Sequence, residues 1–294
     1  MLYDINLRIT HEYDQPAVAG RHMLRLIPAT LPGAQQCIAA ALDTAPAPDK
    51  RFESFDFFGN QVIEATYKQP HDRIEFTLRA RVRRQSGGLQ ADQSPVLETL
   101  AGEIAGVRSL SADAPHHFTP ASARVPLLAE TTDYARNLVA PTMTTLQAVQ
   151  TIGEAIHSDM TFDAEATTVE TPVQDAFAAR RGVCQDFSHL MIACLRGVGV
   201  PAGYVSGFLR TIPPEGQERL QGADAMHAWV RAWCGAAMGW VEYDPTNRLF
   251  ALDDHVVIAR GRDYADTAPI KGVLRTSGSQ SSDHSVDVVV LREP

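Results

Sequence analysis

Three residues of this chain, Cys184, His227 and Asp244, are of the types that together perform nucleophilic catalysis. A thiolate attacks, an imidazole takes up and returns the proton, and a carboxylate holds the imidazole in one tautomer. The three lie far apart in the sequence, so they can act together only if the elements around them bring them to one place.

The residues after Cys184 predict a helix. The apolar positions recur at three- and four-residue intervals and form one face: Phe187, Leu190, Met191, Cys194, Leu195 and Val198. Gly197, Gly199 and Pro201 mark its end, and Gly182 allows a sharp turn into its start. Cys184 is therefore expected at the helix N-terminus, where unpaired N–H groups and the helix dipole favour a thiolate. Taken alone, Cys184 could equally be a small buried residue, as free cysteines usually are.

His227 and Asp244 are predicted to lie on the two strands of a β-hairpin. Residues 224–233 and 240–246 alternate and carry aromatics, and the small, Gly-containing residues 234–239 separate them. A short loop near Gly235 places His227 opposite Asp244, and it also pairs Trp233 with Met238 and Trp229 with Glu242. Opposed residues on one sheet face have Cβ atoms about 4.5–5.5 Å apart, so the carboxylate can hold the imidazole. A slip of one residue would put His227 and Asp244 on opposite faces.

Three motifs occur in the order Cys, His, Asp: Gly182-Val183-Cys184-Gln185-Asp186-Phe187, His227-Ala228-Trp229-Val230, and Trp240-Val241-Glu242-Tyr243-Asp244-Pro245-Thr246. In these motifs, residues 130–260 resemble the transglutaminase-like superfamily of papain-type thiol enzymes. The resemblance implies that Cys184 is the nucleophile, His227 the general base and acid, and Asp244 the residue that orients His227.

The N-terminal part is similar to the β-domain that precedes this core in a bacterial subgroup of the superfamily. The likeness rests on Tyr3-Asp4-Ile5, His11-Glu12-Tyr13, Leu24-Arg25-Leu26-Ile27-Pro28 and Phe57-Phe58-Gly59-Asn60. Residues 3–11 and 74–83 alternate, 22–27 are a probable strand ended by Pro28, and 55–63 carry a hairpin signal. Residues 35–42 are ambiguous and are read as a strand because of what flanks them. Together these short strands favour an antiparallel β-sandwich.

The sequence as a whole predicts an α+β protein. We expect the N-terminal β-sandwich over residues 1–115, a linker rich in Ala, Ser and Pro over 116–126, and the papain-like core over 127–294. Helical periodicity from Thr144 and over 173–179, and a strand over 200–209, belong to the core. Residues 285–291 read as a last strand, and the sequence does not say which sheet it joins.

Composition limits the classes of partner. A net charge of −9 argues against nucleic-acid or anionic-membrane binding. The sequence contains no run of about 18 apolar residues, so no membrane span is predicted. The N-terminus lacks a signal-peptide profile, so a cytoplasmic location is expected.

The four cysteines show no CxxC or zinc spacing and are expected to be free. No nucleotide or metal motif is present, so no cofactor is expected.

Several other residues are of types that could form a site. His189 points away from Cys184 on the predicted helix and is expected to be structural. His116 and His117 lie in the linker and are expected to be exposed. His255, beside Asp253 and Asp254, could imitate a catalytic pair, but it is read as a loop residue without strand context. The basic cluster Arg79, Arg81, Arg83 and Arg84 fits a solvated strand face better than a site for an acidic partner.

The expected activity is hydrolysis of an amide or peptide bond in a protein or peptide substrate, through a thioester on Cys184. If an amine resolves the thioester instead of water, the same site is a transamidase. A non-catalytic binding module on this fold is the third reading, because fold alone does not decide function. The backbone N–H of Cys184 is a natural first donor to the oxyanion; the second donor and the oligomeric state are left open.

Overall fold

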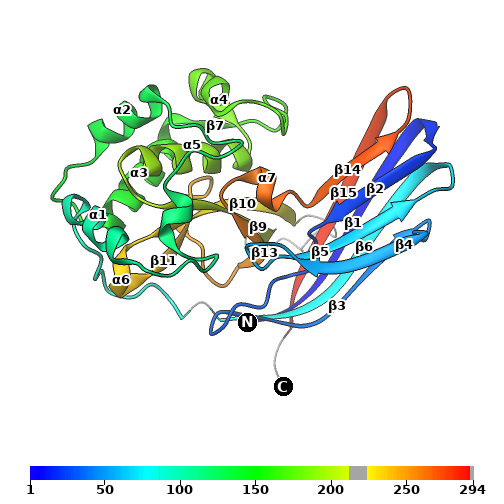
Figure 1. Ribbon diagram of the computed structural model, residues 1–294, viewed down its shortest axis with the longest axis horizontal. Coiled ribbons are helices and arrows are strands. Elements are labelled where there is room, and N and C mark those ends of the chain that lie inside the picture. The colour runs from blue at the N-terminus through cyan, green and yellow to red at the C-terminus, as the bar shows by residue number, and fades with distance from the viewer. Residues whose placement is uncertain (86, 212–223, 292–294) are drawn as a thin grey trace, which may run out of the picture.

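The computed structural model describes residues 1–85, 87–211 and 224–291. Its elements form three layers: helices, a five-stranded sheet, and a β-sandwich that projects from the far side of that sheet (Figure 1). The predicted α+β class, with an antiparallel sandwich ahead of a core of helices packed on an antiparallel sheet, is confirmed. No helix in these residues is long and apolar enough to cross a membrane.

Two four-stranded antiparallel sheets make up the sandwich, in the orders β15-β1-β6-β3 and β14-β2-β5-β4. Their strands are β1 (Leu2–Ala17), β2 (Ala19–Leu24), β3 (Gln35–Ala45), β4 (Lys50–Phe55), β5 (Gln61–Tyr67), β6 (His71–Arg84), β14 (Ile270–Arg275) and β15 (Gln280–Leu291). Alternation decides which side chains are inside. Along β1, Tyr3, Ile5, Leu7 and Ile9 are buried, whereas Asn6 and Arg8 between them are exposed.

The C-terminal strands return to the sandwich. β15 pairs with β1 and β14 pairs with β2 (Figure 1). The predicted boundaries assign the C-terminal residues to the core. Their pairing with β1 and β2 instead makes them part of the sandwich. Val286 and Val288 of β15 lie in the sandwich interior. A helix inside the range expected for the sandwich, α1 (Leu97–Gly106), instead packs its Leu100 into the helix-side core.

The five-stranded sheet has the order β12-β11-β10-β9-β13. Its strands are β9 (Ala202–Leu209), β10 (Ala225–Trp233), β11 (Trp240–Asp244), β12 (Leu249–Phe250) and β13 (His255–Gly261). The helices are α2 (Ala129–Leu138), α3 (Thr145–Asp159), α4 (Val173–Ala179) and α5 (Cys184–Gly197), with the short α6 (Gly235–Met238), α7 (Tyr264–Thr267), the 3₁₀ turn η1 (Pro115–Phe118) and the two-residue strands β7 (Thr161–Phe162) and β8 (Arg181–Gly182). The helices predicted from Thr144, over 173–179 and after Cys184 are confirmed.

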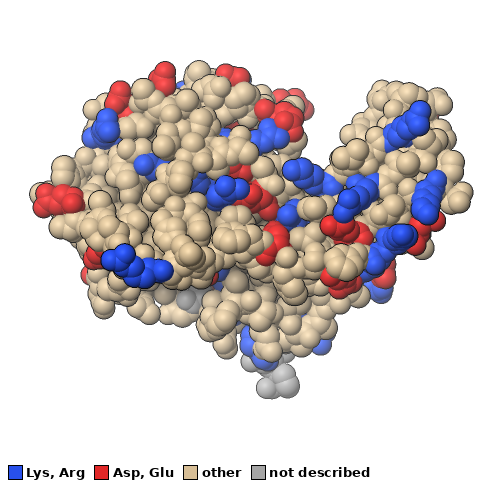
Figure 2. Space-filling model, viewed as in Figure 1, with Lys and Arg blue, Asp and Glu red and all other residues tan. Residues whose placement is uncertain are grey.

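The basic cluster on β6 is neutralised locally. Arg79 pairs with Asp43 and Arg81 with Asp4, whereas Arg84 is buried and lies 3.9 Å from Glu242. Figure 2 shows charges of both signs interspersed over one face of the molecule, without a broad patch of one sign.

A buried histidine makes the sandwich sensitive to acid. His22 is 2% exposed, and neither ring nitrogen has a hydrogen-bond partner among the described residues. Burial, helped by His11 and His71, lowers the pKa of His22 to about 4 from 6.5. The unfolded chain therefore binds this proton first as the pH falls, so the stability present above pH 6.5 is lost between 6.5 and 4.

We expect this loss to reach up to about 3 kcal/mol in the free energy of unfolding. Urea unfolding at pH 7 and at pH 4.5 measures it, and the difference between the two pH values should be smaller in His22→Leu than in the wild type. An equal difference in both proteins would contradict this assignment.

Candidate active site

The start of α5 is fixed by a carboxylate cap. Asp186 Oδ2 accepts hydrogen bonds from the backbone N–H of Val183, at 2.8 Å, and from Thr167 Oγ1, at 2.6 Å. Cys184 is the first residue of α5 and is half-buried. The sequence prediction for this position is therefore confirmed, and the helix N-terminus is directed at the thiol.

Gly182 is required by the cap. A Cβ built on Gly182 would lie 2.5 Å from Asp186 Oδ2 and 2.8 Å from Asp186 Cβ. In Gly182→Ala the cap must move, so we expect a loss of about 1–3 kcal/mol in stability and slower alkylation of Cys184. Thermal unfolding and thiol-labelling rates measure both.

Gly102→Ala is the matched control, because nothing lies within 4 Å of the Cβ it would add to α1. That variant should be at least as stable as the wild type, since alanine is the better helix former. Equal behaviour of the two variants would contradict the role given to Gly182.

The hairpin register differs from the prediction by two residues. Trp233 pairs with Trp240 and Val230 with Tyr243, because residues 235–238 form the helical turn α6 rather than a short loop. A shift of two keeps every side chain on its face. His227 and Asp244 therefore still share a face, as diagonal rather than direct neighbours.

Asp244 is the centre of a buried hydrogen-bond network. It is fully buried and accepts five hydrogen bonds. Oδ2 accepts from His227 Nε2 at 2.8 Å, from His255 Nε2 at 3.0 Å and from Asn247 Nδ2 at 2.8 Å. Oδ1 accepts from the backbone N–H groups of Thr246 and Asn247. These bonds fix the carboxylate and, through it, the tautomer of His227.

Cys184 completes the arrangement, because its side chain interacts with the imidazole of His227 and helps to raise the pKa of that ring. Since Nε2 is bonded to Asp244, Nδ1 is the nitrogen left for the thiol. Burial disfavours the imidazolium, but hydrogen bonds and charges from Asp244 and Cys184 outweigh burial and raise the pKa of His227 to about 10. Burial likewise opposes the charge on Asp244, but the two histidines outweigh it and hold the pKa of that carboxyl well below its usual range. The geometry is that of a nucleophile, a base and the group that orients the base.

His255 was expected to be a loop residue outside the site, and that expectation is wrong. His255 begins strand β13 and is 2% exposed, with its ring bonded to Asp244. The acidic residues 253–254 suggested a loop, but the apolar run 256–259 that follows is typical of a buried strand and could have placed His255 at its start.

His227, Asp244 and His255 could also hold a metal ion by donor type, since their ligand atoms lie within 4.8 Å of one another. Hydrogen bonds already occupy these atoms: both Nε2–H groups donate to Asp244 Oδ2. The network explains the cluster without an ion.

Trp229 and Glu242 form the layer beneath the imidazole. The Trp229 ring stacks near His227, with centroids 6.2 Å apart, and its Nε1 donates to Glu242 at 2.9 Å. Burial opposes the charge of Glu242, but Arg260 and Arg84 outweigh it and lower its pKa to about 2. Trp229 is fully buried, so it supports His227 from behind rather than lining a groove.

The remaining candidate histidines, His189, His116 and His117, form no hydrogen bond with the three candidate catalytic residues in the described part of the chain. His189 is buried and accepts a hydrogen bond from the backbone N–H of Tyr264. His116 and His117 were expected in an exposed linker; they lie in η1 and are half-buried, because Pro115 and Phe118 pack this turn onto the core. Gln185 donates to the carbonyl of Val169 and so is held by that loop.

Comparison with known proteins agrees with this architecture. Residues 132–245 match the transglutaminase-like superfamily, and residues 3–83 match the bacterial transglutaminase-like N-terminal region. An uncharacterized protein of Mycobacterium tuberculosis (strain ATCC 25618 / H37Rv) is 34% identical over 292 residues, which cover 96% of this chain and 88% of that protein. One from Mycobacterium leprae is 29% identical, covering 97% of this chain and 99% of that protein.

A crystal structure of a proposed cysteine protease from Cytophaga hutchinsonii has the same fold. It is 22% identical, with a TM-score of 0.75 over 100% of this chain and 92% of that chain. The chain therefore belongs to the transglutaminase-like superfamily, with a bacterial transglutaminase-like N-terminal region ahead of its core.

Proposed function

We propose that the protein is a cysteine hydrolase that cleaves amide or peptide bonds through a triad of Cys184, His227 and Asp244. The observation that carries the proposal is the series in which the Cys184 thiol interacts with the imidazole of His227 and that imidazole is hydrogen-bonded to a fully buried carboxylate. A binding module would have no use for a thiol held at a helix N-terminus against an imidazole.

In the proposed reaction the Cys184 thiolate attacks the carbonyl carbon, and its backbone N–H at the start of α5 stabilises the oxyanion. The imidazolium of His227 gives its proton to the leaving amine, which leaves a thioester on Cys184. His227 then takes a proton from water as the water attacks the thioester, which releases the acid and regenerates the Cys184 thiolate beside the imidazolium. Asp244 keeps Nδ1 of His227 directed at the sulfur throughout.

An activated ester tests acylation without knowledge of the natural substrate. Release of nitrophenol from p-nitrophenyl acetate should show turnover in the wild type and none above background in Cys184→Ala. Cys37→Ala is the matched control, since it removes a half-buried thiol on the sandwich and should change nothing. Turnover that survives in Cys184→Ala would overturn the proposal.

Deacylation decides between hydrolysis and transamidation. A primary amine such as putrescine is added during ester turnover, and the products are resolved by mass. For a hydrolase, acetate remains the main product at millimolar amine. Acetylated amine as the main product would replace hydrolysis by transamidation, and absence of acylation would favour a binding module. Cleavage of fluorescein-labelled casein then tests peptidase activity directly.

His255 is proposed to position the carboxylate of Asp244. Its hydrogen bond to a charged group is worth about 1.5–3 kcal/mol, so His255→Ala should slow turnover of the ester at least about tenfold. His255→Gln, which retains an N–H donor, should restore part of the rate. A loss of stability with unchanged turnover would assign His255 a structural role only.

A further inference from the structure

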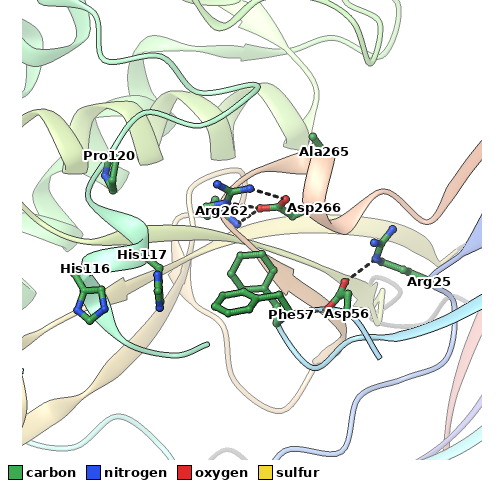
Figure 3. A pocket seen from close by; sticks show the side chains of 10 residues that line it. Arg25, Asp56, Phe57, His116, His117, Pro120, Arg262, Ala265 and Asp266 are labelled. Carbon is green, nitrogen blue, oxygen red and sulfur yellow. Dashed lines mark hydrogen bonds and ion pairs between the residues drawn. The ribbon is translucent and has the colours of Figure 1, made fainter. Parts of the chain in front are cut away.

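A cavity lies where the sandwich meets the core. It has a volume of about 500 Å³, which is within the range of small-molecule sites. Three separate parts of the chain line it: Arg25 and Asp56–Phe58 from the sandwich, His116, His117 and Pro120 from the segment around η1, and Arg262, Ala265 and Asp266 around α7 (Figure 3).

This cavity is distinct from the triad. Arg262 follows the last residue of β13, whereas His255 is the first residue of the same strand. A strand of this length spans about 20 Å, so the cavity and Asp244 lie near opposite ends of β13.

Two residues that line the cavity each have a buried nitrogen atom without a hydrogen-bond partner among the described residues. Arg25 is 8% exposed, and its Nη1 has no hydrogen-bond partner among the described residues; neither does the buried Nε2 of His116. A buried donor without a partner costs about 1–3 kcal/mol, so Arg25 Nη1 favours an incoming acceptor; His116 Nε2 does so only in the tautomer that carries its proton there.

The two carboxylates of the cavity are already occupied. Asp56 accepts from Arg25 Nε at 3.0 Å and from the Phe58 and Asn60 backbone N–H groups, also at 3.0 Å. Asp266 accepts from the backbone and from the guanidinium of Arg262. An anion is therefore not opposed by a free carboxylate, and the guanidinium groups remain able to attract it.

The rest of the lining is aromatic and apolar. Phe57 is 61% exposed although it is large and apolar, and its ring meets His117 edge-on with centroids 5.3 Å apart. Figure 3 shows Phe57 between the histidines on one side and Arg25 on the other. An apolar surface beside unpaired donors suits a ligand with an apolar body and an acidic end.

We propose that this cavity binds a carboxylate with an aromatic or apolar body, either a small free acid or the C-terminal residue of a peptide. The carboxylate would lie on the Arg25 side of Phe57 (Figure 3) and accept a hydrogen bond from the guanidinium group of Arg25, and the apolar body would cover the ring of Phe57. The proposal does not depend on the nucleophilic role of Cys184.

Calorimetry with N-acetyl-L-phenylalanine and its primary amide tests the carboxylate requirement. Both are titrated into the Cys184→Ala chain, in which the amide cannot be cleaved by the thiol. We expect saturable binding of the acid and at least tenfold weaker binding of the amide. A third ligand, N-acetyl-glycyl-glycyl-L-phenylalanine, distinguishes a peptide C-terminus from a small free acid. If it binds more tightly than N-acetyl-L-phenylalanine, the natural ligand is a peptide end. If the two bind equally, the natural ligand is a small acid.

Phe57→Ala should weaken binding of the acid at least tenfold, because its exposed ring can be removed without disturbing the core. Phe55→Ala is the matched control, since Phe55 is 73% exposed and does not line this cavity. Arg25→Gln should bring the affinity of the acid down to that of the amide; if that variant does not fold, the comparison of acid with amide still decides. No saturable binding, equal affinities for acid and amide, or no effect of Phe57→Ala would overturn the proposal.

Discussion

Replacement of Cys184 by alanine is expected to reduce turnover by at least about 10⁴-fold, because the variant has no nucleophile to form the thioester. The fold should survive, since Cys184 is half-buried at a helix start and alanine is a good helix residue. Steady-state turnover of the ester and thermal unfolding of the same samples measure the two effects.

The remaining cysteines cannot replace Cys184. Burial raises the pKa of Cys194 and Cys234 to about 12, and burial also raises the pKa of Cys37. Few thiolates form at these sites near neutral pH, so single alanine variants at Cys37 or Cys234 should retain turnover. A small loss in Cys184→Ala, or a large loss in Cys37→Ala, would place the nucleophile elsewhere.

Replacement of Asp244 has the second largest expected effect, and it acts on both stability and chemistry. Asp244→Ala leaves five donors in the protein interior without their acceptor, which should cost about 3–5 kcal/mol. Asp244→Asn keeps one acceptor oxygen and should fold, but it loses the charge that favours the imidazolium. We expect turnover in Asp244→Asn to fall about 10²–10⁴-fold.

The pH profile separates a chemical role of Asp244 from a structural one. In the wild type, proton donation to the leaving group should be lost as the pH rises through the pKa of His227, about 10. Asp244→Asn removes the negative charge that helps to raise this pKa, so the alkaline limb should move to lower pH. Asp43→Asn, at an exposed ion pair on the sandwich, is the control and should leave the profile unchanged. An unshifted limb in Asp244→Asn would contradict the pairing with His227.

The elements that carry Cys184, His227 and Asp244 could be predicted, because local patterns determine the helix, the two strands and the face on which each side chain lies. The apolar face after Cys184 determines the helix, and alternation on each hairpin strand determines which face carries His227 and Asp244. The predicted register was wrong because residues 235–238 form a helical turn, which the small residues there did not distinguish from a short loop. The predicted face of His227 and Asp244 is still correct, because a shift of two residues leaves each side chain on the same side of the sheet.

What could not be predicted depends on long-range pairing. Strands β14 and β15 join the sandwich through partners more than 200 residues away, and nothing in their own alternation specifies that edge. The contact of His255 with Asp244 likewise depends on β13 pairing with β9, which the sequence of either strand does not reveal. The cavity at Arg25 combines segments from three parts of the chain and has no local motif.

Alkylation of the native protein with limiting iodoacetamide from pH 5 to pH 9 tests the central claim, the pairing of Cys184 with His227, most directly. Peptide mass mapping identifies the modified cysteine at each pH. We predict selective modification of Cys184 at pH 6, where an ordinary thiol with a pKa of about 8.5 reacts slowly, and loss of that selectivity in His227→Ala. Slow modification of Cys184 at pH 6, or equal rates in the wild type and His227→Ala, would contradict the pairing.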